Sequence, residues 1–401
     1  MKGKILMTEK TFRHLASVKT INYVKPNPMA ERLETAYIGG WPVVVGKGEY
    51  KQGDKIVFFE PDSLLPVENP VFAPFTDRCK HAENSYGKDC VILKTVKLRG
   101  QISQGLIVSL SKLNIPEDTE VGTDVSNILG IEKYNPPEIN INSSKQPLPF
   151  PSFITKTDEE RVQNLQNMVE YLCNTPNIAQ YYRASEKVDG TSTTFFRHTV
   201  LDDNDNVVVK YGVCSRNQQI QPNIDYTSQE WLESDPKRQQ RLIMNTENTY
   251  WRNYYNSGAK NLLDQLAEQN PEATSVAIQG ESIGVGINGN RLKLKDIRFL
   301  AFNVLIDGTR HNPAEYGDMF QGMIVPQLDY RLPVEYGDNP NDAMQKIINM
   351  SNNLKSMVTT NLMAEGIVWR IDDSNVDEYP TGFNPEWKHF KAINQNYLLK
   401  M

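Results

Sequence analysis

The segment Ala184-Ser185-Glu186-Lys187-Val188-Asp189-Gly190 places a lysine at the end of a strand-like stretch, with Asp-Gly following after one intervening residue. At ordinary residue usage, a chain of this length contains a Lys-x-Asp-Gly by chance roughly one time in ten. The tetrapeptide alone therefore indicates little. Its meaning depends on whether the rest of the chain supplies groups that could act together with Lys187.

Length and composition bound the class of protein. The 401 residues suffice for two or three domains with a sizeable core. No apolar run approaches the ~20 residues of a membrane span, and residues 1–9 are too poor in apolar side chains for a signal peptide. We therefore expect a cytoplasmic protein without a membrane partner. A monomer is expected, although the sequence does not fix the oligomeric state.

The cysteines and the charge exclude two further classes. Cys79, His81 and Cys90 could form part of a metal site, but no second Cys/His pair completes it, so reduced thiols are preferred over zinc. The net charge of −6 argues against a protein that coats nucleic acid by bulk attraction. Residues 1–130 carry 17 Lys/Arg and 15 Asp/Glu, whereas the acidic remainder carries 26 and 34. Any nucleic-acid surface must therefore be local.

The first 130 residues contain short β segments bounded by Gly, Pro or Asp, at 36–46, 55–59, 91–96 and 105–108. About five such strands in this length suit a small closed barrel, and an OB-fold is the leading candidate. A stretch rich in Pro, Asn and Ser follows, which predicts a linker over residues 131–155.

The second domain is predicted over residues 156–401. Thr157 is a plausible N-cap and Glu160 would complete a capping box, so a helix is expected to begin there. Beyond Lys187 strands dominate, with a helical interlude around 228–268. Strands interrupted by helices, without strict alternation, favour an α+β fold over a doubly wound sheet.

A lysine that attacks the α-phosphate of a nucleoside triphosphate requires several other groups around it. Its amine must be neutral, so its pKa must lie well below the usual 10.4. A divalent cation held by nearby carboxylates would lower that pKa and neutralise the phosphate. Basic groups for the phosphates and an aromatic platform for the base complete the requirement.

Each of these groups appears in order, at the end or start of a predicted strand, where side chains can converge on a cleft. Asp189 lies two residues after Lys187, and the later fragments carry Glu281, Phe302, Glu365 and Lys391.

This order resembles the motif set of the covalent nucleotidyltransferase superfamily, which includes ATP-dependent DNA and RNA ligases and mRNA capping enzymes. The residues within these motifs most resemble those of RNA ligases that carry an N-terminal OB domain, and the resemblance covers nearly the whole chain. The matching motifs are Lys187-Val188-Asp189-Gly190, Ser215-Arg216-Asn217, Gly280-Glu281, Phe302, Glu365-Gly366-Ile367-Val368 and Phe390-Lys391. Three flanking signatures add to them, in residues 157–164, 98–106 and 48–54.

The resemblance implies an N-terminal OB-like barrel followed by an adenylyltransferase domain of antiparallel sheets flanked by helices. It also implies an ATP-dependent RNA ligase that uses Mg²⁺ or Mn²⁺ and acts through lysyl-AMP and adenylylated RNA. The enzyme would seal 3′-OH and 5′-phosphate ends, with RNA ends as its partner and RNA repair as the expected role.

The resemblance also implies a role for each site residue. Lys187 would be the nucleophile, and Asp189, Glu281 and Glu365 would orient a hydrated metal ion. The nucleotide would be bound by seven residues: Glu186 at the adenine amine, Phe302 stacked on the ring, Glu281 at the ribose, Arg216 and Lys391 at ribose or phosphate, Arg161 at the terminal phosphates, and Lys388.

Two positions depart from the family pattern. Many relatives have two lysines flanking one residue in the last motif, whereas here the first is His389 and Lys388 is displaced by one position. A neutral His389 imidazole would weaken the contact with the phosphate. Alternatively, the Lys388 side chain reaches round to make that contact. Asn303 follows Phe302 where an aspartate is more common. Neither change touches the nucleophile or the carboxylates, so activity is expected.

The sequence also argues against three other classes. DNA ligases and capping-type guanylyltransferases usually place an OB domain after the last motif, whereas this chain ends ten residues beyond Lys391. A catalytically silent OB protein that binds nucleic acid should have lost the lysine or the carboxylates first. Gly284-Val285-Gly286-Ile287-Asn288-Gly289 matches the dinucleotide fingerprint, but the residues that follow do not open a helix. We therefore read it as a loop flanking the site.

Overall fold

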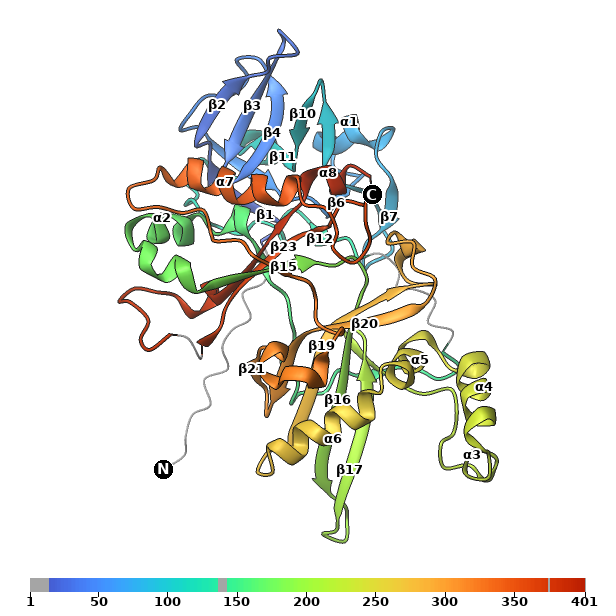
Figure 1. The fold of residues 1–401 in the computed structure, drawn as a ribbon. Helices are drawn as coiled ribbons and strands as arrows, with labels where there is room; N and C mark the ends of the chain where they lie inside the picture. Colours follow the sequence, from blue (N-terminus) through green and yellow to red (C-terminus); the bar gives the residue numbers. More distant parts are fainter. Residues whose placement is uncertain (1–13, 136–142, 374–375, 401) are drawn as a thin grey trace, which may run out of the picture. The chain divides into compact units, whose positions relative to one another are not determined.

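The computed structural model describes residues 14–135, 143–373 and 376–400 of the chain (Figure 1). The chain divides into two compact units, one of Met1–Pro136 with Leu398–Met401 and one of Pro137–Tyr397. Residues 1–9, considered above for a signal peptide, and residues 136–142 of the predicted linker lie outside the described residues. Each unit contains its own buried clusters and is described by itself.

The first unit consists of short strands in four small antiparallel sheets, in the orders β1-β5-β11, β2-β3-β4, β10-β9 and β12-β6-β8-β7. Its only helices in the described residues are the short α1 (Ala73–Thr76) and 3₁₀ turns. The strands are β1 (Ala16–Thr20), β2 (Tyr23–Pro26), β3 (Leu33–Ile38), β4 (Trp41–Gly46), β5 (Lys55–Phe59), β6 (Ser63–Pro66), β7 (His81–Glu83), β8 (Asp89–Ile92), β9 (Val96–Leu98), β10 (Gln101–Ser103), β11 (Leu106–Ser109) and β12 (Glu132–Lys133).

Strand β5 explains how this unit is held together. Val57 and Phe59 enter one buried cluster, whereas Ile56 and Phe58 enter a second cluster on the other face of the strand. A strand that is buried on both faces reads as a continuous apolar run, which is why residues 55–59 were recognisable as a strand. The predicted segment 36–46 forms the hairpin β3–β4 instead of one strand.

The second unit contains two larger sheets, a seven-stranded one in the order β13-β18-β17-β16-β19-β20-β21 and a five-stranded one in the order β14-β24-β23-β15-β22. All pairings in them are antiparallel except that of β14 with β24. The strands are β13 (Leu148–Pro149), β14 (Glu160–Arg161), β15 (Tyr182–Lys187), β16 (Thr191–Leu201), β17 (Val207–Cys214), β18 (Gln218–Ile220), β19 (Ser275–Gly284), β20 (Ile297–Ile306), β21 (Thr309–His311), β22 (Gln327–Leu328), β23 (Gly366–Ile371) and β24 (His389–Ile393).

Each of these sheets is covered by helices on one face (Figure 1). Apolar residues of α5 and α6 form one buried cluster with β16, β19 and β20, while those of α2 and α7 form another with β15, β23 and β24. The helices are α2 (Gln166–Asn174), α3 (Gln229–Leu232), α4 (Pro236–Thr246), α5 (Thr249–Asn256), α6 (Ala259–Gln269), α7 (Pro340–Asn352) and α8 (Gln395–Leu398). The predicted α+β class and the helical interlude are confirmed.

The faces of the two sheets that carry no helices contribute residues that lie against one another. The Arg370 guanidinium of β23 lies over the Phe302 ring of β20, and Arg310 of β21 donates a hydrogen bond to His389 of β24. Residues of both sheets therefore line one pocket. The sequence motifs lie on the strands that border it.

The prediction that a helix begins at Thr157 is wrong. Glu160 and Arg161 form β14, which pairs in parallel with Phe390 and Lys391 of β24, and α2 begins only at Gln166. The capping-box pattern was local, whereas the pairing partner lies more than 200 residues further along the chain. The misreading matters because this strand brings Asp158 and Glu159 to the pocket side of the five-stranded sheet.

Three smaller observations bear on excluded functions. The glycine-rich segment 284–289 leads from β19 through a 3₁₀ turn to the antiparallel strand β20, so it is not a Rossmann turn. His81 is hydrogen bonded at both ring nitrogens, to Asp89 at 2.8 Å and to the Thr76 carbonyl at 2.8 Å, which leaves neither for a metal. No helix in the described part of the chain has the length and hydropathy of a membrane span.

Candidate active site

Lys187 is the last residue of β15, and alternation along this strand determines where its side chain points. Ala184 packs in the cluster beneath α2 and α7, so Ser185 and Lys187 lie on the opposite face, which is turned toward the seven-stranded sheet. In the register with β23, Lys187 pairs with Gly366. The lysine is thereby placed beside the residue that precedes Gly366 in the sequence.

That residue is Glu365, and its Oε2 lies 2.8 Å from Lys187 Nζ. Gly366 allows β23 to pack closely against β24 on its other side, because a Cβ atom there would lie 2.3 Å from the Ala392 carbonyl oxygen. Burial alone would lower the pKa of Lys187, but the charges of Glu365 and Glu281 raise it above its ordinary value. With these carboxylates alone, the lysine is therefore held protonated.

Gly190 brings the Lys-x-Asp-Gly segment against β19. A Cβ atom at Gly190 would lie 2.4 Å from the Ser282 carbonyl oxygen and 2.7 Å from Glu281 Cγ, so only glycine fits. Glu281 is thereby placed within the field of Lys187. Burial, opposed by Lys187 but supported by the charges of Glu365 and Asp189, raises the pKa of Glu281 to about 8.

Asp189 is the third carboxylate of this group. Burial, together with the charge of Glu365, raises its pKa, while a hydrogen bond from the Tyr397 hydroxyl acts in the opposite direction. Its Oδ2 atom is buried and has no hydrogen-bond partner, and the nearest cation is Arg291, whose Nε lies 3.9 Å away. A buried oxygen without a partner costs about 1–3 kcal/mol, so this atom is suited to a further ligand.

These residues fit a hydrated divalent cation. Asp189, Glu281 and Glu365 offer the oxygen donors that Mg²⁺ and Mn²⁺ prefer. Burial, and then repulsion among these carboxylates, raises the pKa values of Asp189 and Glu281. Within the described residues, no three His, Cys, Asp or Glu side chains are arranged to bind an ion directly. Contact through the water molecules of the ion, which Mg²⁺ keeps readily, matches this looser spacing.

A β-bulge determines the direction of the Phe302 side chain. Gln279 pairs with Asn303 and Gly280 pairs with Ala301, so Phe302 is the extra residue of β20. Bulges re-aim side chains and are common beside active sites. Phe302 lies outside the cluster under α5 and α6, and its ring is 5.2 Å from Arg370 Cζ. A base would stack on the other ring face or displace the arginine.

The predicted phosphate-binding cations are gathered around Asp158. Its Oδ2 lies 2.8 Å from Arg216 Nη2, and its Oδ1 lies 3.4 Å from Lys391 Nζ. Burial lowers the pKa of Lys391 to about 8, although Asp158 opposes the shift. Arg161 pairs with Lys391 in the register of β14 with β24, and its charge also lowers that pKa. Three of the predicted nucleotide ligands are therefore neighbours.

Glu159 occupies the centre of a second group of cations. Arg370 Nη2 donates to its Oε1 at 2.6 Å. Burial would raise the pKa of Glu159, but the charges of Arg370 and Lys391 outweigh it, so its pKa lies far below the ordinary range. Glu159 is therefore ionised at neutral pH.

At the position where many relatives carry the first lysine of the last motif, this chain has His389, with Lys388 beside it. Burial and the charge of Arg310 lower the pKa of His389 to about 4, so its imidazole is neutral, and its Nε2 accepts a hydrogen bond from Arg310 Nη1 at 2.7 Å. Lys388 lies 2.8 Å from Asp373 and over the Tyr379 ring. Lys388 is therefore engaged at the pocket rim, and the cation beside His389 is Arg310.

Glu186 lies on the opposite face of β15 from Lys187. Its carboxylate accepts hydrogen bonds from Ser356 Oγ at 2.6 Å and from the Met357 backbone N–H at 2.7 Å. Burial raises its pKa, and these two hydrogen bonds oppose the rise. The structure thus gives Glu186 two protein partners, and its contact with adenine stays a prediction.

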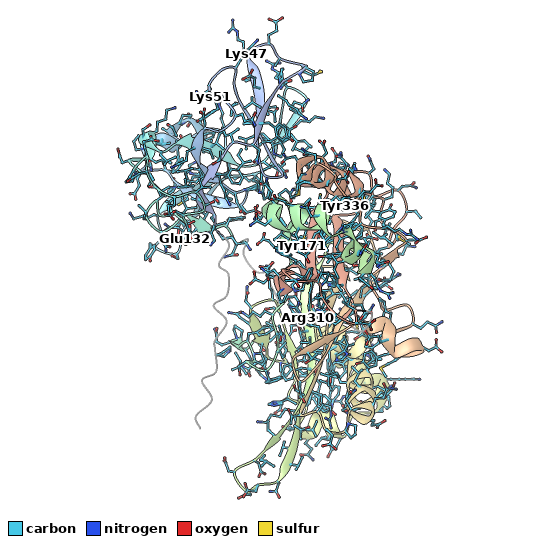
Figure 2. The ribbon with its side chains drawn as sticks, turned by 90° about the vertical axis from the view of Figure 1, so that its left-hand side faces the viewer. Lys47, Lys51, Glu132, Tyr171, Arg310 and Tyr336 are labelled. Atoms are coloured by element: carbon cyan, nitrogen blue, oxygen red, sulfur yellow. The ribbon has the colours of Figure 1, made fainter. Side chains whose placement is uncertain are left out.

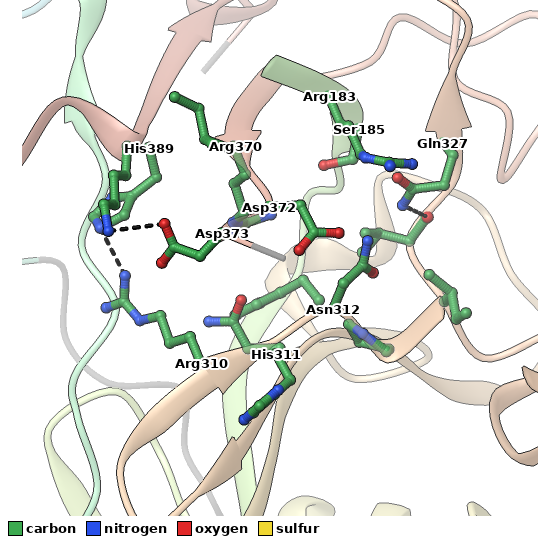
Figure 3. A pocket seen from close by; sticks show the side chains of 17 residues that line it. Arg183, Ser185, Arg310, His311, Asn312, Gln327, Arg370, Asp372, Asp373 and His389 are labelled. Atoms are coloured by element: carbon green, nitrogen blue, oxygen red, sulfur yellow. Dashed lines mark hydrogen bonds and ion pairs between the residues drawn. The ribbon is translucent and has the colours of Figure 1, made fainter. Parts of the chain in front are cut away.

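Ser185, which lies two residues before Lys187 on the same face of β15, lines the pocket, whereas Lys187, Glu281 and Glu365 are not among its lining residues. Figure 3 shows Arg183, Ser185 and Gln327 on one side and Arg310 with His389 on the other. Phe302 also lines the pocket, so the predicted aromatic platform faces an open space. Its charged lining residues are Arg183, Arg310, Arg370 and Lys388 together with Asp372 and Asp373, so cations outnumber carboxylates in a pocket that offers groups for a base and for anionic oxygens.

Several residues of this site were missed from the sequence. They are Glu159, Arg291, Arg310, Arg370 and Tyr397. Arg370 follows Glu365-Gly366-Ile367-Val368 by two residues and alternates with the buried Trp369, which is a signal that could have identified it. The others carry no local signal, because their partners are set by tertiary contacts.

Comparisons with known families agree with this geometry. A family model described as RNA ligase matches residues 180–387, which is more than half of the chain. A second model, described as an OB-fold domain, matches residues 15–110, so the predicted OB-fold is confirmed. A search of curated proteins found no match.

Solved structures of a Naegleria gruberi RNA ligase are similar to this chain over almost its whole length. A mutant with ATP and Mn is 28% identical, with a TM-score of 0.71, and the match covers 96% of this chain and 99% of that chain. A mutant with AMP and Mn is 29% identical, with a TM-score of 0.71 and coverage of 97% and 99%. The ligase with PPi is 28% identical, with a TM-score of 0.70 and coverage of 97% and 99%.

Proposed function

The chain belongs to the RNA ligase family, and on this premise we propose that it uses ATP to join a 3′-hydroxyl end and a 5′-phosphate end of RNA. The observation that carries the proposal is the convergence of the Lys187 amine with the carboxylates of Asp189, Glu281 and Glu365. Similar structures contain ATP, AMP, PPi and Mn. These are the reactants and products of adenylyl transfer.

The first step forms a covalent bond between Lys187 Nζ and the α-phosphorus of ATP. The bond from this phosphorus to the bridging oxygen breaks, pyrophosphate leaves, and lysyl-AMP remains. Lys187 must first lose a proton, and the carboxylates oppose that loss because they raise its pKa. A divalent cation bound by these carboxylates would neutralise their field and the charge that develops on the phosphate.

The protein groups divide the remaining tasks of this step. Lys391 and Arg216 would contact the phosphates, with Arg161 at the terminal ones, once those oxygens replace the Asp158 carboxylate between the first two cations. Phe302 would carry the base, aimed into the pocket by its bulge. Holding the nucleotide in line with Lys187 contributes to the rate by proximity and orientation.

The second step transfers AMP from Lys187 to the RNA 5′-phosphate, and the third step forms the phosphodiester bond. An oxygen of the RNA 5′-phosphate attacks the AMP phosphorus, the bond to Lys187 breaks, and the adenylate moves to the RNA end. The 3′-hydroxyl then attacks the RNA phosphate, AMP leaves with the electron pair, and a phosphodiester bond closes the strand. The same cations that hold the triphosphate would hold the two joined phosphates of the intermediate.

Formation of lysyl-AMP tests the proposal directly. The protein would be incubated with ATP and either Mg²⁺ or Mn²⁺, and the intact mass would be measured. We expect a mass gain of one AMP that is absent in Lys187→Ala, and the gain should reverse on addition of pyrophosphate. Failure to form the adduct with either metal would refute an adenylyl-transfer function.

End chemistry requires its own assay. Nicked duplexes would be offered with either an RNA or an all-DNA 3′-OH strand, and with either a phosphate or a hydroxyl at the 5′ side. We expect sealing only with the 5′-phosphate and a strong preference for RNA at the 3′-OH. Equal sealing of the all-DNA nick would contradict the RNA assignment. A role in RNA repair, a cytoplasmic location and a monomeric state stay predictions.

A further inference from the structure

The glycine-rich loop that follows β19 has no role in the reaction described so far, yet it reaches the Lys-x-Asp-Gly segment. Asn288 of this loop donates a hydrogen bond from its side-chain amide to the Gly190 carbonyl. Arg291, three residues later, brings its Nε to 3.9 Å from Asp189 Oδ2. The loop therefore supplies two contacts to the residues that immediately follow Lys187.

The helix α8 meets the same place from the other direction. The Tyr397 hydroxyl is hydrogen bonded to the Asp189 carboxylate and accepts a hydrogen bond from Arg291 Nη1 at 3.0 Å. The Arg291 guanidinium also lies 5.6 Å from the centre of the Tyr397 ring. Asp189, Arg291 and Tyr397 thus form a closed triangle built from three separate segments.

Tyr397 is itself held in place by the buried residue Asn394. The backbone N–H of Tyr397 donates to the Asn394 carbonyl at 3.1 Å and to its Oδ1 at 3.2 Å. Asn394 donates from its backbone N–H to the Glu365 carbonyl at 2.8 Å, and from its side chain to the Ala364 carbonyl at 3.1 Å. The tyrosine is therefore tied to Ala364 and Glu365, which directly precede β23.

We propose that Tyr397 and Arg291 are positioning residues that fix the Asp189 carboxylate, so that its Oδ2 is presented to the water shell of the divalent cation. The proposal rests on the proposed function, because that function requires the cation. Asp189 Oδ2 is buried and has no hydrogen-bond partner, and Arg291 Nε lies 3.9 Å from it. Residues that orient metal ligands typically change metal affinity or activity by about 10–100-fold when they are replaced.

Tyr397→Phe removes only the hydroxyl and leaves the ring that packs against Arg291. The test measures Mn²⁺ binding by the paramagnetic resonance of free Mn²⁺, in the Lys187→Ala background with ATP present so that no adenylylation occurs. We expect the Mn²⁺ dissociation constant to rise about 10-fold or more. The dissociation constant for ATP without metal should change less than twofold. Arg291→Gln should weaken Mn²⁺ binding in the same direction.

Tyr336→Phe is the matched control, because Tyr336 is 80% exposed (Figure 2) and lies outside this triangle. It should leave Mn²⁺ binding unchanged. If Tyr397→Phe lowers the melting temperature strongly, Arg291→Gln decides the matter alone, since Arg291 lies at the surface of the loop. Mn²⁺ binding within twofold of the parent in the decisive variant would overturn the proposal.

The two possible failures are distinguishable. If the parent protein forms lysyl-AMP while these variants bind Mn²⁺ normally, only the positioning role is refuted. If the parent forms no lysyl-AMP with either metal, the proposed function itself fails. Within the active parent, a shift in the metal concentration for half-maximal adenylylation, with the KM for ATP unchanged, would support positioning over general damage to the fold.

Discussion

Lys187 and Glu365 form an ion pair between β15 and the start of β23, with 2.8 Å between Lys187 Nζ and Glu365 Oε2. Their side chains are 26% and 18% exposed, so water screens the pair only partly. The nucleophile is therefore stored next to a base that keeps it protonated. A divalent cation that binds Glu365 would release the lysine, which couples metal binding to nucleophile activation.

The first prediction concerns Glu365→Gln. Removing this charge should lower the pKa of Lys187, because Glu365 is the strongest influence that raises it. The amine should then react with cyanate at lower pH than in the parent, measured by mass spectrometry of the Lys187 peptide without metal. Adenylylation should nevertheless fall about 10–100-fold, because a metal-orienting group is lost. Glu378→Gln, at an exposed position, provides the control. If the pH dependence of the reaction of Lys187 with cyanate is the same in Glu365→Gln as in the parent, the coupling is contradicted.

The second prediction concerns the stability of Glu281→Gln. The pKa of Glu281 is about 8 in the folded protein against about 4.3 when unfolded. Between these values the folded state keeps a proton that the unfolded state loses, so the free energy of unfolding falls as pH rises. Glu281→Gln should therefore raise the melting temperature at pH 7–8 and leave it unchanged near pH 4, while abolishing adenylylation. A gain that is independent of pH would contradict this assignment.

Much of this site could be predicted because its residues follow local rules. The Lys-x-Asp-Gly segment begins at the last residue of β15, and Glu365 directly precedes β23, whereas Gly280-Glu281 lies inside β19 rather than at its predicted end. The close packing at Gly190 and Gly366 leaves room only for glycine. The apolar run of β5 and the helical interlude were equally local. Signals of this kind depend on the residue and its immediate neighbours, which a sequence displays directly.

The remainder depended on contacts between distant segments. Residues 157–161 have the pattern of a capped helix, but pairing with β24 outweighs this local preference and brings Glu159 to Arg370. The bulge that aims Phe302 is visible only in the register of β19 with β20. Such pairings are decided by the whole fold, and no short pattern encodes them.

The third prediction concerns Asn303→Asp, which introduces the residue more common in relatives. Asn303 Nδ2 donates to Gln279 Oε1 at 3.0 Å, and Gln279 Nε2 donates to the Thr155 carbonyl at 2.8 Å. A carboxylate would face Gln279 Oε1 without a proton to donate, and turning the Gln279 amide would break its bond to Thr155. We expect a loss of about 1–3 kcal/mol in the free energy of unfolding at pH 7, measured in urea.

That loss should shrink toward acidic pH, where the introduced carboxyl gains a proton and can donate again. Asn204→Asp at an exposed turn provides the control and should change stability by less than about 0.5 kcal/mol. Equal stability of Asn303→Asp and the parent at pH 7 would show that the relay from Asn303 to Thr155 is not required.

The fourth prediction concerns His389→Lys, which restores the lysine found in many relatives. His389 is neutral and accepts a hydrogen bond from Arg310 at 2.7 Å. A lysine there would place two buried cations together, so we expect a loss of up to about 3–5 kcal/mol in stability. The double variant with Arg310→Ala should recover most of this loss, as a double-mutant cycle in urea would measure. If His389→Lys alone is as stable as the parent, Arg310 is not the cation that replaces the missing lysine.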